Sequence, residues 1–276
     1  MQGRLVPRIN GRIQAFPDSN WQDEFPLASQ IGFDSIEFIF DAEETFPIEA
    51  HPLLEKECPS IRQLVDRHGV AVNTVCADYF ITHPFHSPDP IAGARRVELA
   101  MELIGNSRIL GLTDVVIPCV DASKLASEND RVQLVRQLRP VVDLCEESGI
   151  NLALETDLPP QEFSALLDQF DSQRVTVNYD VGNSASLGFD PTQEWSAYGS
   201  RVSSVHIKDR LLHGTTVPLG SGAAKFDSFF PTARDHGYFG LFIIQGARGA
   251  DDFATARTYK DFVDGKLKEF FGVTEG

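Results

Sequence analysis

The sequence predicts a parallel α/β protein, a (β/α)8 TIM barrel formed by a single domain over residues 1–276. Short apolar runs of strand type alternate with amphipathic stretches almost throughout the chain, as in a parallel sheet with helical crossovers. The length, 276 residues, is typical of an eight-unit barrel. No GxGxxG fingerprint follows the first apolar run, which disfavours the alternative, a doubly wound open sheet.

Eight strands and eight helices are predicted, in alternation. The strands are expected at 3–6, 35–40, 71–76, 114–118, 151–155, 174–179, 202–207 and 241–245. The helices are expected at 21–31, 60–68, 91–110, 129–148, 161–170, 191–198, 226–236 and 251–271. Several helices are followed by the glycine that commonly ends a helix. These glycines are Gly32, Gly69, Gly111, Gly149 and Gly237.

Composition and charge exclude several classes of protein. The formal net charge of −16 disfavours binding to a phosphate backbone, so we expect no nucleic-acid partner. No apolar run approaches the roughly 18 residues of a membrane span, and the N-terminus lacks the apolar core of a signal peptide. The four cysteines are scattered and form no CxxC pair. We expect a cytoplasmic protein with no membrane partner, and a homo-oligomer remains open.

Four apolar runs in the second half of the chain end in residues that can bind a metal. NLALE ends at Glu155, VTVNYD at Asp180, SSVH at His206 and LFIIQ at Gln245. Successive members are separated by about one strand–helix unit, so they are expected on four consecutive strands. Catalytic groups of such barrels gather at the carboxyl ends of the strands.

Strand alternation supports the same site. Asn178 and Asp180 share one face of their predicted strand, and Ala153 and Glu155 share one face of theirs. These faces are polar or small and are expected to point into the barrel, whereas the larger apolar faces meet the helices. Two carboxylates, an imidazole and an amide oxygen suit one divalent cation, Mn²⁺, Co²⁺, Zn²⁺ or Mg²⁺.

The order and spacing of these segments resemble the xylose-isomerase-like TIM barrels, in particular the sugar phosphate isomerase/epimerase group. The resemblance covers nearly the whole chain. It is carried by GFDSIEFIFD in the second unit, LALETD in the fifth, NYDVGN in the sixth, and HIKDR followed by VPLGSG in the seventh. It implies a divalent-metal-dependent enzyme of carbohydrate metabolism that acts on a sugar or sugar phosphate through an enediolate.

The resemblance also implies roles for individual residues. In that family a Glu, an Asp, a His and a second Glu bind the metal, and the two Glu residues exchange protons with the carbon beside the substrate carbonyl. Glu155, Asp180 and His206 match the first three, and Gln245 stands where the second Glu is expected. An amide offers a metal ligand but no general base. Asn183 stands where many members place a substrate-binding His. These departures permit one-base chemistry.

Further candidates complete the predicted site. Glu155 is the expected base, and Lys208 is expected to face inward and polarise a substrate oxygen. Arg248 resembles the family's substrate-contacting arginine, whose fork suits a phosphate or carboxylate. Glu37 is expected either to bind a sugar hydroxyl or to pair with Arg4. The VPLGSG segment at 217–222 lacks the GxxxxGK[ST] pattern of a phosphate cradle and is expected to be a supporting loop.

Three other functions remain open. A metal-dependent dehydratase of a cyclic polyol, of the inosose type, needs only one base. A non-catalytic sugar-binding barrel is compatible with the amide at Gln245. An apurinic endonuclease would share the architecture, but it needs more His and Glu ligands and a basic groove, which the net charge of −16 disfavours.

Overall fold

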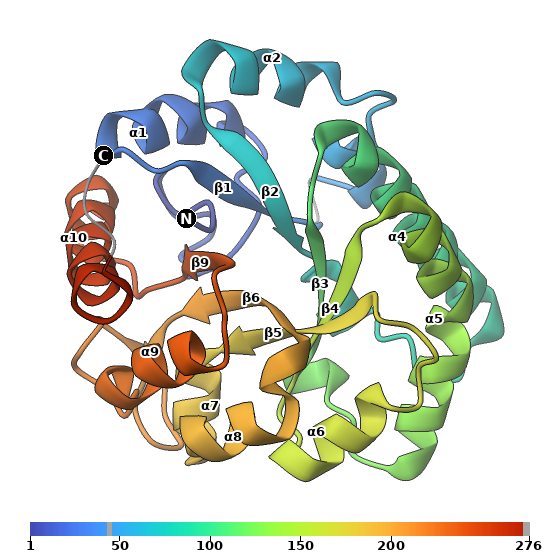
Figure 1. The fold of residues 1–276 in the computed structure, drawn as a ribbon. Coiled ribbons are helices and arrows are strands. Elements are labelled where there is room, and N and C mark those ends of the chain that lie inside the picture. Colours follow the sequence, from blue (N-terminus) through green and yellow to red (C-terminus); the bar gives the residue numbers. More distant parts are fainter. Residues whose placement is uncertain (43–45, 273–276) are drawn as a thin grey trace.

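The structure is a computed structural model that describes residues 1–42 and 46–272. The chain forms a nearly closed barrel ringed by helices (Figure 1). Within these residues seven parallel strands form one sheet whose spatial order follows the chain. They are β1 (Ser35–Ile39), β2 (Ala71–Cys76), β3 (Asp114–Cys119), β4 (Asn151–Thr156), β5 (Val175–Asp180), β6 (Val202–Ile207) and β9 (Leu241–Ile244). The α/β barrel is therefore confirmed. The predicted single domain also includes residues 43–45 and 273–276, which lie outside the described residues.

The N-terminal segment closes the gap between β1 and β9. The Gln2 N–H donates to the Ile244 carbonyl at 3.1 Å, and the Gly3 N–H donates to the Glu37 carbonyl at 3.2 Å. Figure 1 shows the N-terminus between these two strands. In place of a full first strand, the barrel thus has a single parallel bridge between Gln2 and Glu37.

The predicted strand at 3–6 is wrong, and a buried carboxylate explains why. Glu24 accepts hydrogen bonds from the backbone N–H groups of Leu5, at 3.0 Å to either oxygen, and Val6, at 3.1 Å. A strand would have given these groups to a neighbouring strand. Instead these N–H groups donate to the Glu24 side chain of the first helix, and the chain leaves the sheet at this point.

Ten α-helices occur in the described residues, and the eight predicted helices are among them, one with the predicted ends and seven with ends that differ by one to three residues. They are α1 (Glu24–Ile31), α2 (Pro59–His68), α4 (Pro90–Leu110), α5 (Glu128–Ser148), α6 (Pro160–Leu167), α8 (Pro191–Tyr198), α9 (Phe226–Asp235) and α10 (Asp252–Phe271). Two short helices, α3 (Tyr79–Thr82) and α7 (Val181–Leu187), and a small hairpin of β7 (Asp209–Arg210) and β8 (Thr216–Val217) were not predicted. All three lie between a barrel strand and the predicted helix that follows it.

Local sequence sets the helix ends, as α5 illustrates. Ser127 accepts a hydrogen bond from the Asp130 N–H at 3.2 Å, and Asp130 accepts one from the Ser127 N–H at 2.8 Å. This reciprocal capping box satisfies two N–H groups that a helix start leaves free. At the other end Gly149 adopts φ 74°, a left-handed conformation that glycine takes without steric cost.

The core divides into an inner and an outer layer. Cys76, Val116 and Ala153 form a small apolar cluster on three adjacent strands. Their strand neighbours, such as Leu152 and Leu154, belong to the larger cluster that includes residues of the surrounding helices. The inward face therefore carries small or polar side chains, and this composition leaves room for a site inside the barrel mouth. No helix of the described residues is long and apolar enough to cross a membrane.

Candidate metal and active site

Three of the predicted ligands converge at the carboxyl ends of neighbouring strands. Glu155 lies on β4, Asp180 ends β5 and His206 lies on β6, directly opposite Asp180 in the register. One ligand atom of each residue lies within 4.8 Å of those of the other two, and all three residues are buried. Parallel strands in register thus bring two carboxylates and an imidazole to one point.

Gln245 follows β9 directly and is also buried. Its N–H donates to the Ile207 carbonyl at 2.9 Å, and its own carbonyl accepts a hydrogen bond from Arg4 Nη1 at 3.0 Å. The side-chain Oε1 has no hydrogen-bond partner in the described part of the chain. Because a buried acceptor without a partner is costly, this oxygen fits a further ligand of a cation. The residues present therefore suit a divalent metal.

His206 is held between two carboxylates. Its Nε2 lies 2.9 Å from Glu37 Oε1, and its Nδ1 lies 3.4 Å from Glu155 Oε2. Burial alone would lower the pKa of His206, but the two carboxylates raise it to about 10. A carboxylate behind a metal-binding histidine fixes the ring and leaves the other nitrogen for the metal. Glu37 is the carboxylate behind the His206 ring, and the Nδ1 of His206 faces Glu155.

Glu37 lies beneath the cluster. It accepts hydrogen bonds from Thr74 Oγ1 at 2.8 Å and Gln2 Nε2 at 3.2 Å. Burial would raise its pKa, but the charge and hydrogen bond of His206 outweigh burial and lower it. It is fully buried and is not among the residues of the large cavity described below. The alternative pairing with Arg4 is wrong, because the Arg4 guanidinium bonds to Gln2 Oε1 instead.

Two asparagines orient Glu155. Asn178 Nδ2 donates to Oε2 at 2.7 Å, and Asn183 Nδ2 donates to Oε1 at 2.7 Å. Burial would raise the pKa of Glu155, whereas the hydrogen bond and charge of His206 lower it, with help from Lys208. Asn178 was not predicted as a site residue, although its strand position beside Asp180 placed it on the inward face.

The short helix α7 connects Asp180 to the rest of the site. Asp180 caps this helix, and its Oδ1 accepts a hydrogen bond from the Asn183 N–H at 2.8 Å. Lys208 Nζ donates to Asp180 Oδ2 at 3.3 Å. Asn183 Oδ1 accepts a hydrogen bond from Arg210 Nη1 at 2.9 Å. The residues that follow β5 and β6 thus form one connected layer around Glu155.

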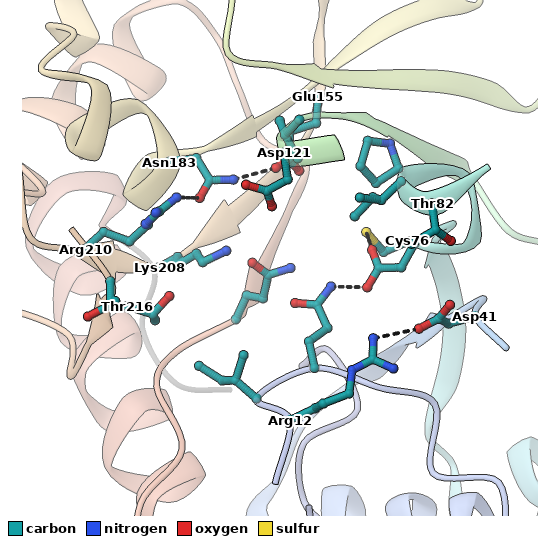
Figure 2. A pocket seen from close by; sticks show the side chains of 18 residues that line it. Arg12, Asp41, Cys76, Thr82, Asp121, Glu155, Asn183, Lys208, Arg210 and Thr216 are labelled. Atoms are coloured by element: carbon teal, nitrogen blue, oxygen red, sulfur yellow. Dashed lines mark hydrogen bonds and ion pairs between the residues drawn. The ribbon is translucent and has the colours of Figure 1, made fainter. Parts of the chain in front are cut away.

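A polar cavity of about 530 Å³ includes Glu155, Asn183, Lys208 and Gln245 in its wall. Figure 2 shows Asn183, Lys208 and Arg210 on one side of the cavity, Cys76 on the other side, and Glu155 at the top between them. Volumes of this size accommodate small ligands. The cavity therefore joins the residues of the cluster to a space suited to a polar molecule of sugar size.

Several cavity residues were not singled out from the sequence. They are Arg12, paired with Asp41 at 3.0 Å, together with Asp78, Asp121 and Arg210. Arg210 lies within the HIKDR segment and Asp41 ends the GFDSIEFIFD segment, so both were visible in the sequence. Arg12, Asp78 and Asp121 lie in the N-terminal segment or in loops after β2 and β3, where no periodicity marks them.

The structure places Arg248 away from the cavity. Its guanidinium donates to the Val6 carbonyl at 2.6 Å and the Ile13 carbonyl at 3.1 Å, and it pairs with Asp252 at 2.8 Å. Its side chain is only 4% exposed. These contacts bind the N-terminal segment to the start of α10, and contact with a substrate stays a prediction.

Two backbone donors of the VPLGSG loop, and a third just beyond it, are already engaged. The N–H groups of Gly220, Gly222 and Ala224 donate to the buried carboxylate of Asp209 at 2.9, 2.8 and 3.0 Å. Gly222 passes so close that an added Cβ would lie 2.2 Å from Asp209 Oδ1. These three amides cannot also bind a phosphate, so the loop supports the mouth of the barrel as expected.

Comparisons with known proteins agree with this architecture. The sequence model of the family described as xylose isomerase-like TIM barrel matches residues 25–259. The L-ribulose-5-phosphate 3-epimerase UlaE of Escherichia coli O1:K1 / APEC is 23% identical over 257 residues, which is 90% of each chain.

Two solved structures have the same fold. One is the D-allulose 3-epimerase from Methylomonas sp. in complex with D-allulose, with a TM-score of 0.71, 17% identity and coverage of 91% of this chain and 93% of that chain. The other is a xylose isomerase-like TIM barrel protein from Mycobacterium smegmatis in complex with magnesium. Its TM-score is 0.69 at 18% identity, and the match covers 94% of this chain and 92% of that chain.

Proposed function

Because the chain belongs to the xylose isomerase-like TIM barrel family, we propose that it is a divalent-metal-dependent epimerase or isomerase of a sugar or sugar phosphate. The convergence of Glu155, Asp180 and His206 beside a polar cavity carries this proposal. The similarity to an L-ribulose-5-phosphate 3-epimerase over 90% of both chains supports the substrate class.

Glu155, Asp180, His206 and Gln245 would hold the metal. All four are buried, and their oxygen and nitrogen donors match Mn²⁺, Co²⁺, Zn²⁺ or Mg²⁺. A bound divalent ion supplies Lewis acidity, which polarises a carbonyl oxygen and stabilises negative charge on it. Glu37 would act through His206 by holding its ring.

Glu155 is the proposed base that removes the proton from the carbon beside the carbonyl. The hydrogen bonds from Asn178 and Asn183 fix both of its oxygens, so the carboxylate is positioned before the substrate arrives. Removing that proton yields an enediolate, and a proton is then delivered either to the opposite face of the same carbon or to the neighbouring carbon. The first outcome gives an epimer and the second gives the aldose–ketose isomer.

Lys208 and Asn183 are the proposed substrate contacts in the cavity wall. Lys208 Nζ lies 3.3 Å from Asp180, and its remaining hydrogens are available to a substrate oxygen. Arg210 adds a guanidinium beside Asn183 and donates to neutral acceptors on Asn183 and Gly214. A hydroxyl or a phosphate oxygen would suit these donors.

The test is a panel of substrates with metal controlled. Chelator-treated protein would receive Mn²⁺, Co²⁺, Zn²⁺ or Mg²⁺ and then L-ribulose 5-phosphate, L-ribulose, D-allulose, D-tagatose or D-fructose. We expect metal-dependent formation of an epimer or isomer from at least one sugar, detected by chromatography. Absence of any product with every metal would contradict the proposal.

A dehydratase is the second candidate, and Gln245 is the observation that favours it. An amide at this position gives no second carboxylate base, and elimination of water from a cyclic polyol ketone needs one base. The same metal-restored protein would be given an inosose. Formation of the absorbing unsaturated ketone, with no turnover of the ketoses, would select this function over epimerisation.

A further inference from the structure

We propose that Asp78 is the second proton-transfer residue of this site, the group that returns a proton to the substrate carbon after Glu155 has removed one. This inference rests on the proposed function. An epimerase must protonate the enediolate on the face opposite to the one it deprotonated, and the Gln245 amide cannot serve as acid or base. Another ionisable group in the cavity is therefore required.

Asp78 is the cavity carboxyl whose surroundings suit this task. The described part of the cavity wall contains the carboxyl groups of Asp41, Asp78, Asp121 and Glu155. Asp41 is paired with Arg12 at 3.0 Å, and Asp121 is exposed. Asp78 is only 8% exposed, and it comes from the loop after β2, two strands away from Glu155 on β4. It thus approaches a ligand from a different side.

Two neutral side chains donate hydrogen bonds to Asp78. The Cys76 thiol donates to Oδ1 at 3.2 Å, and Gln14 Nε2 donates to Oδ2. Burial, together with the negative charges nearby, raises the pKa of Cys76 well above its ordinary value, so this thiol keeps its proton. Neutral donors position a carboxyl group without fixing a charge on it, which an acid–base catalyst needs.

The same network reaches the strand end that carries Gln245. Gln14 Oε1 accepts a hydrogen bond from Arg4 Nη2 at 2.6 Å, and Arg4 Nη1 donates to the Gln245 carbonyl at 3.0 Å. Arg4 is 2% exposed, so its bond to the Gln245 carbonyl is buried, and its bond to Gln14 is partly buried. Gln14 and Arg4 therefore connect Asp78 to the backbone at Gln245.

The electrostatics of the cavity agree with this assignment. Burial raises the pKa of Asp78 to about 6, with Asp41 and Glu155 adding to the rise and the hydrogen bonds from Cys76 and Gln14 opposing it. A carboxyl with such a pKa holds a proton in a useful fraction of molecules near neutral pH. Asp78 can therefore donate a proton under conditions where an ordinary aspartate could not.

The proposed step balances in protons and charge. The Glu155 carboxylate takes the hydron from the substrate carbon, and the C–H electron pair passes into the enediolate. Protonated Asp78 then gives its proton to the other face of that carbon, which restores the carbonyl with inverted configuration. Glu155 ends as the acid and Asp78 as the carboxylate, and each exchanges with solvent to reset the site. No oxidant or reductant is needed.

The experiment separates removal of the proton from inversion. Wild-type protein and an Asp78→Asn variant, both with Mn²⁺ restored, would be incubated with L-ribulose 5-phosphate and with D-allulose in D₂O. Loss of the substrate C–H signal and formation of the epimer would be followed together after removal of the metal. We expect Asp78→Asn to retain exchange into recovered substrate while inversion falls at least about 100-fold. Asp78→Glu should restore part of the inversion.

Asp121→Asn is the matched control, since it removes another carboxylate from the same wall at a backbone φ of 51° that asparagine tolerates. It should keep the wild-type ratio of inversion to exchange. The proposal for Asp78 is overturned if Asp78→Asn inverts as well as wild type, or if exchange and inversion fall equally. Absence of exchange in the wild type as well would instead overturn the proposed function.

Discussion

At position 245 the chain places an amide where the family resemblance calls for a second carboxylate. The Gln245 Oε1 is buried and has no partner in the described residues, while the backbone on either side of it is held by Ile207 and Arg4. The position is therefore rigid, and only the charge and basicity of its side chain differ from a carboxylate. Substitution of Gln245 should therefore change metal affinity through its charge, and proton transfer through its basicity.

Gln245→Glu should tighten Mn²⁺ binding by at least about tenfold, because affinity at oxygen-rich sites rises with the charge of the ligands. Isothermal titration with Mn²⁺ measures this directly. Gln161→Glu makes the same change at an exposed position of α6 and should leave the dissociation constant unchanged. An unaltered affinity in Gln245→Glu would show that the side chain does not bind the metal.

Glu155→Gln should lower turnover of the active sugar by about 10²–10⁴, the usual contribution of a general base. The thermal midpoint should change little, since the amide keeps the volume and one of the two acceptor oxygens facing Asn178 and Asn183. Glu147→Gln, at an exposed position on α5, is the control. Full activity in Glu155→Gln would remove this residue from the mechanism.

Among the elements, α7 bears most directly on the site. It starts at the ligand Asp180, carries Asn183 and packs against Lys208 at Gly182. This helix was not predicted, because its seven residues follow β5 without a loop and are too few to show a helical period. The strands β4 to β6 were predicted well, since their inward and outward faces differ clearly in size.

Gly182→Ala should impair activity more than stability. An added Cβ would lie 2.8 Å from Lys208 Cγ and 2.9 Å from the Lys208 backbone, so α7 or the chain at Lys208, just after β6, must shift. We expect kcat to fall at least about tenfold, with a loss of about 1–3 kcal/mol in the free energy of unfolding. The measurements are steady-state kinetics and urea denaturation.

Gly105→Ala in α4 is the control for this substitution, since nothing lies within 4 Å of its added Cβ. It should stabilise the protein by about 0.5–1 kcal/mol and leave kcat unchanged. Wild-type kinetics in Gly182→Ala would show that the contact between α7 and Lys208 does not position the site.

For the whole molecule, the alternation of apolar runs and amphipathic stretches was enough to predict the barrel and the convergence of ligands on adjacent strands. It was not enough to predict how the barrel closes, because the Glu24 carboxylate that binds Leu5 and Val6 is a tertiary contact. The role of Asp78 was equally invisible, since it depends on burial and on side chains from two other segments. Distant contacts of this kind leave no periodic pattern.

The stability of the whole molecule should depend on the protonation of His51. This ring is 1% exposed, its Nε2 bonds to the Ile39 carbonyl at 3.0 Å, and its Nδ1 accepts from the Leu53 N–H at 3.2 Å. Burial lowers the pKa of His51 from 6.5 to about 3. Between pH 6.5 and about pH 3, His51 binds a proton in the unfolded chain but not in the folded protein. The stabilisation is therefore complete above pH 6.5 and is lost as the pH falls toward 3.

The free energy of unfolding should consequently decrease as the pH is lowered from 6 to 4. His51 should account for about 1.4 kcal/mol of this decrease per pH unit. His51→Gln, which cannot titrate, should show a shallower slope in urea titrations across this range. His83→Gln, at an exposed position, is the control and should keep the wild-type slope. Identical slopes for His51→Gln and wild type would contradict the neutral state of this ring.

The most direct test of the account is deuterium incorporation by the wild-type protein. Metal-stripped protein would be resupplied with one divalent ion at a time in D₂O, given the ketoses and ketose phosphates named above, and examined by NMR. We expect deuterium at the carbon next to the carbonyl only when metal is present, and none in Glu155→Gln. No incorporation with any metal, in protein that binds the metal and stays folded, would contradict enediolate chemistry at this site.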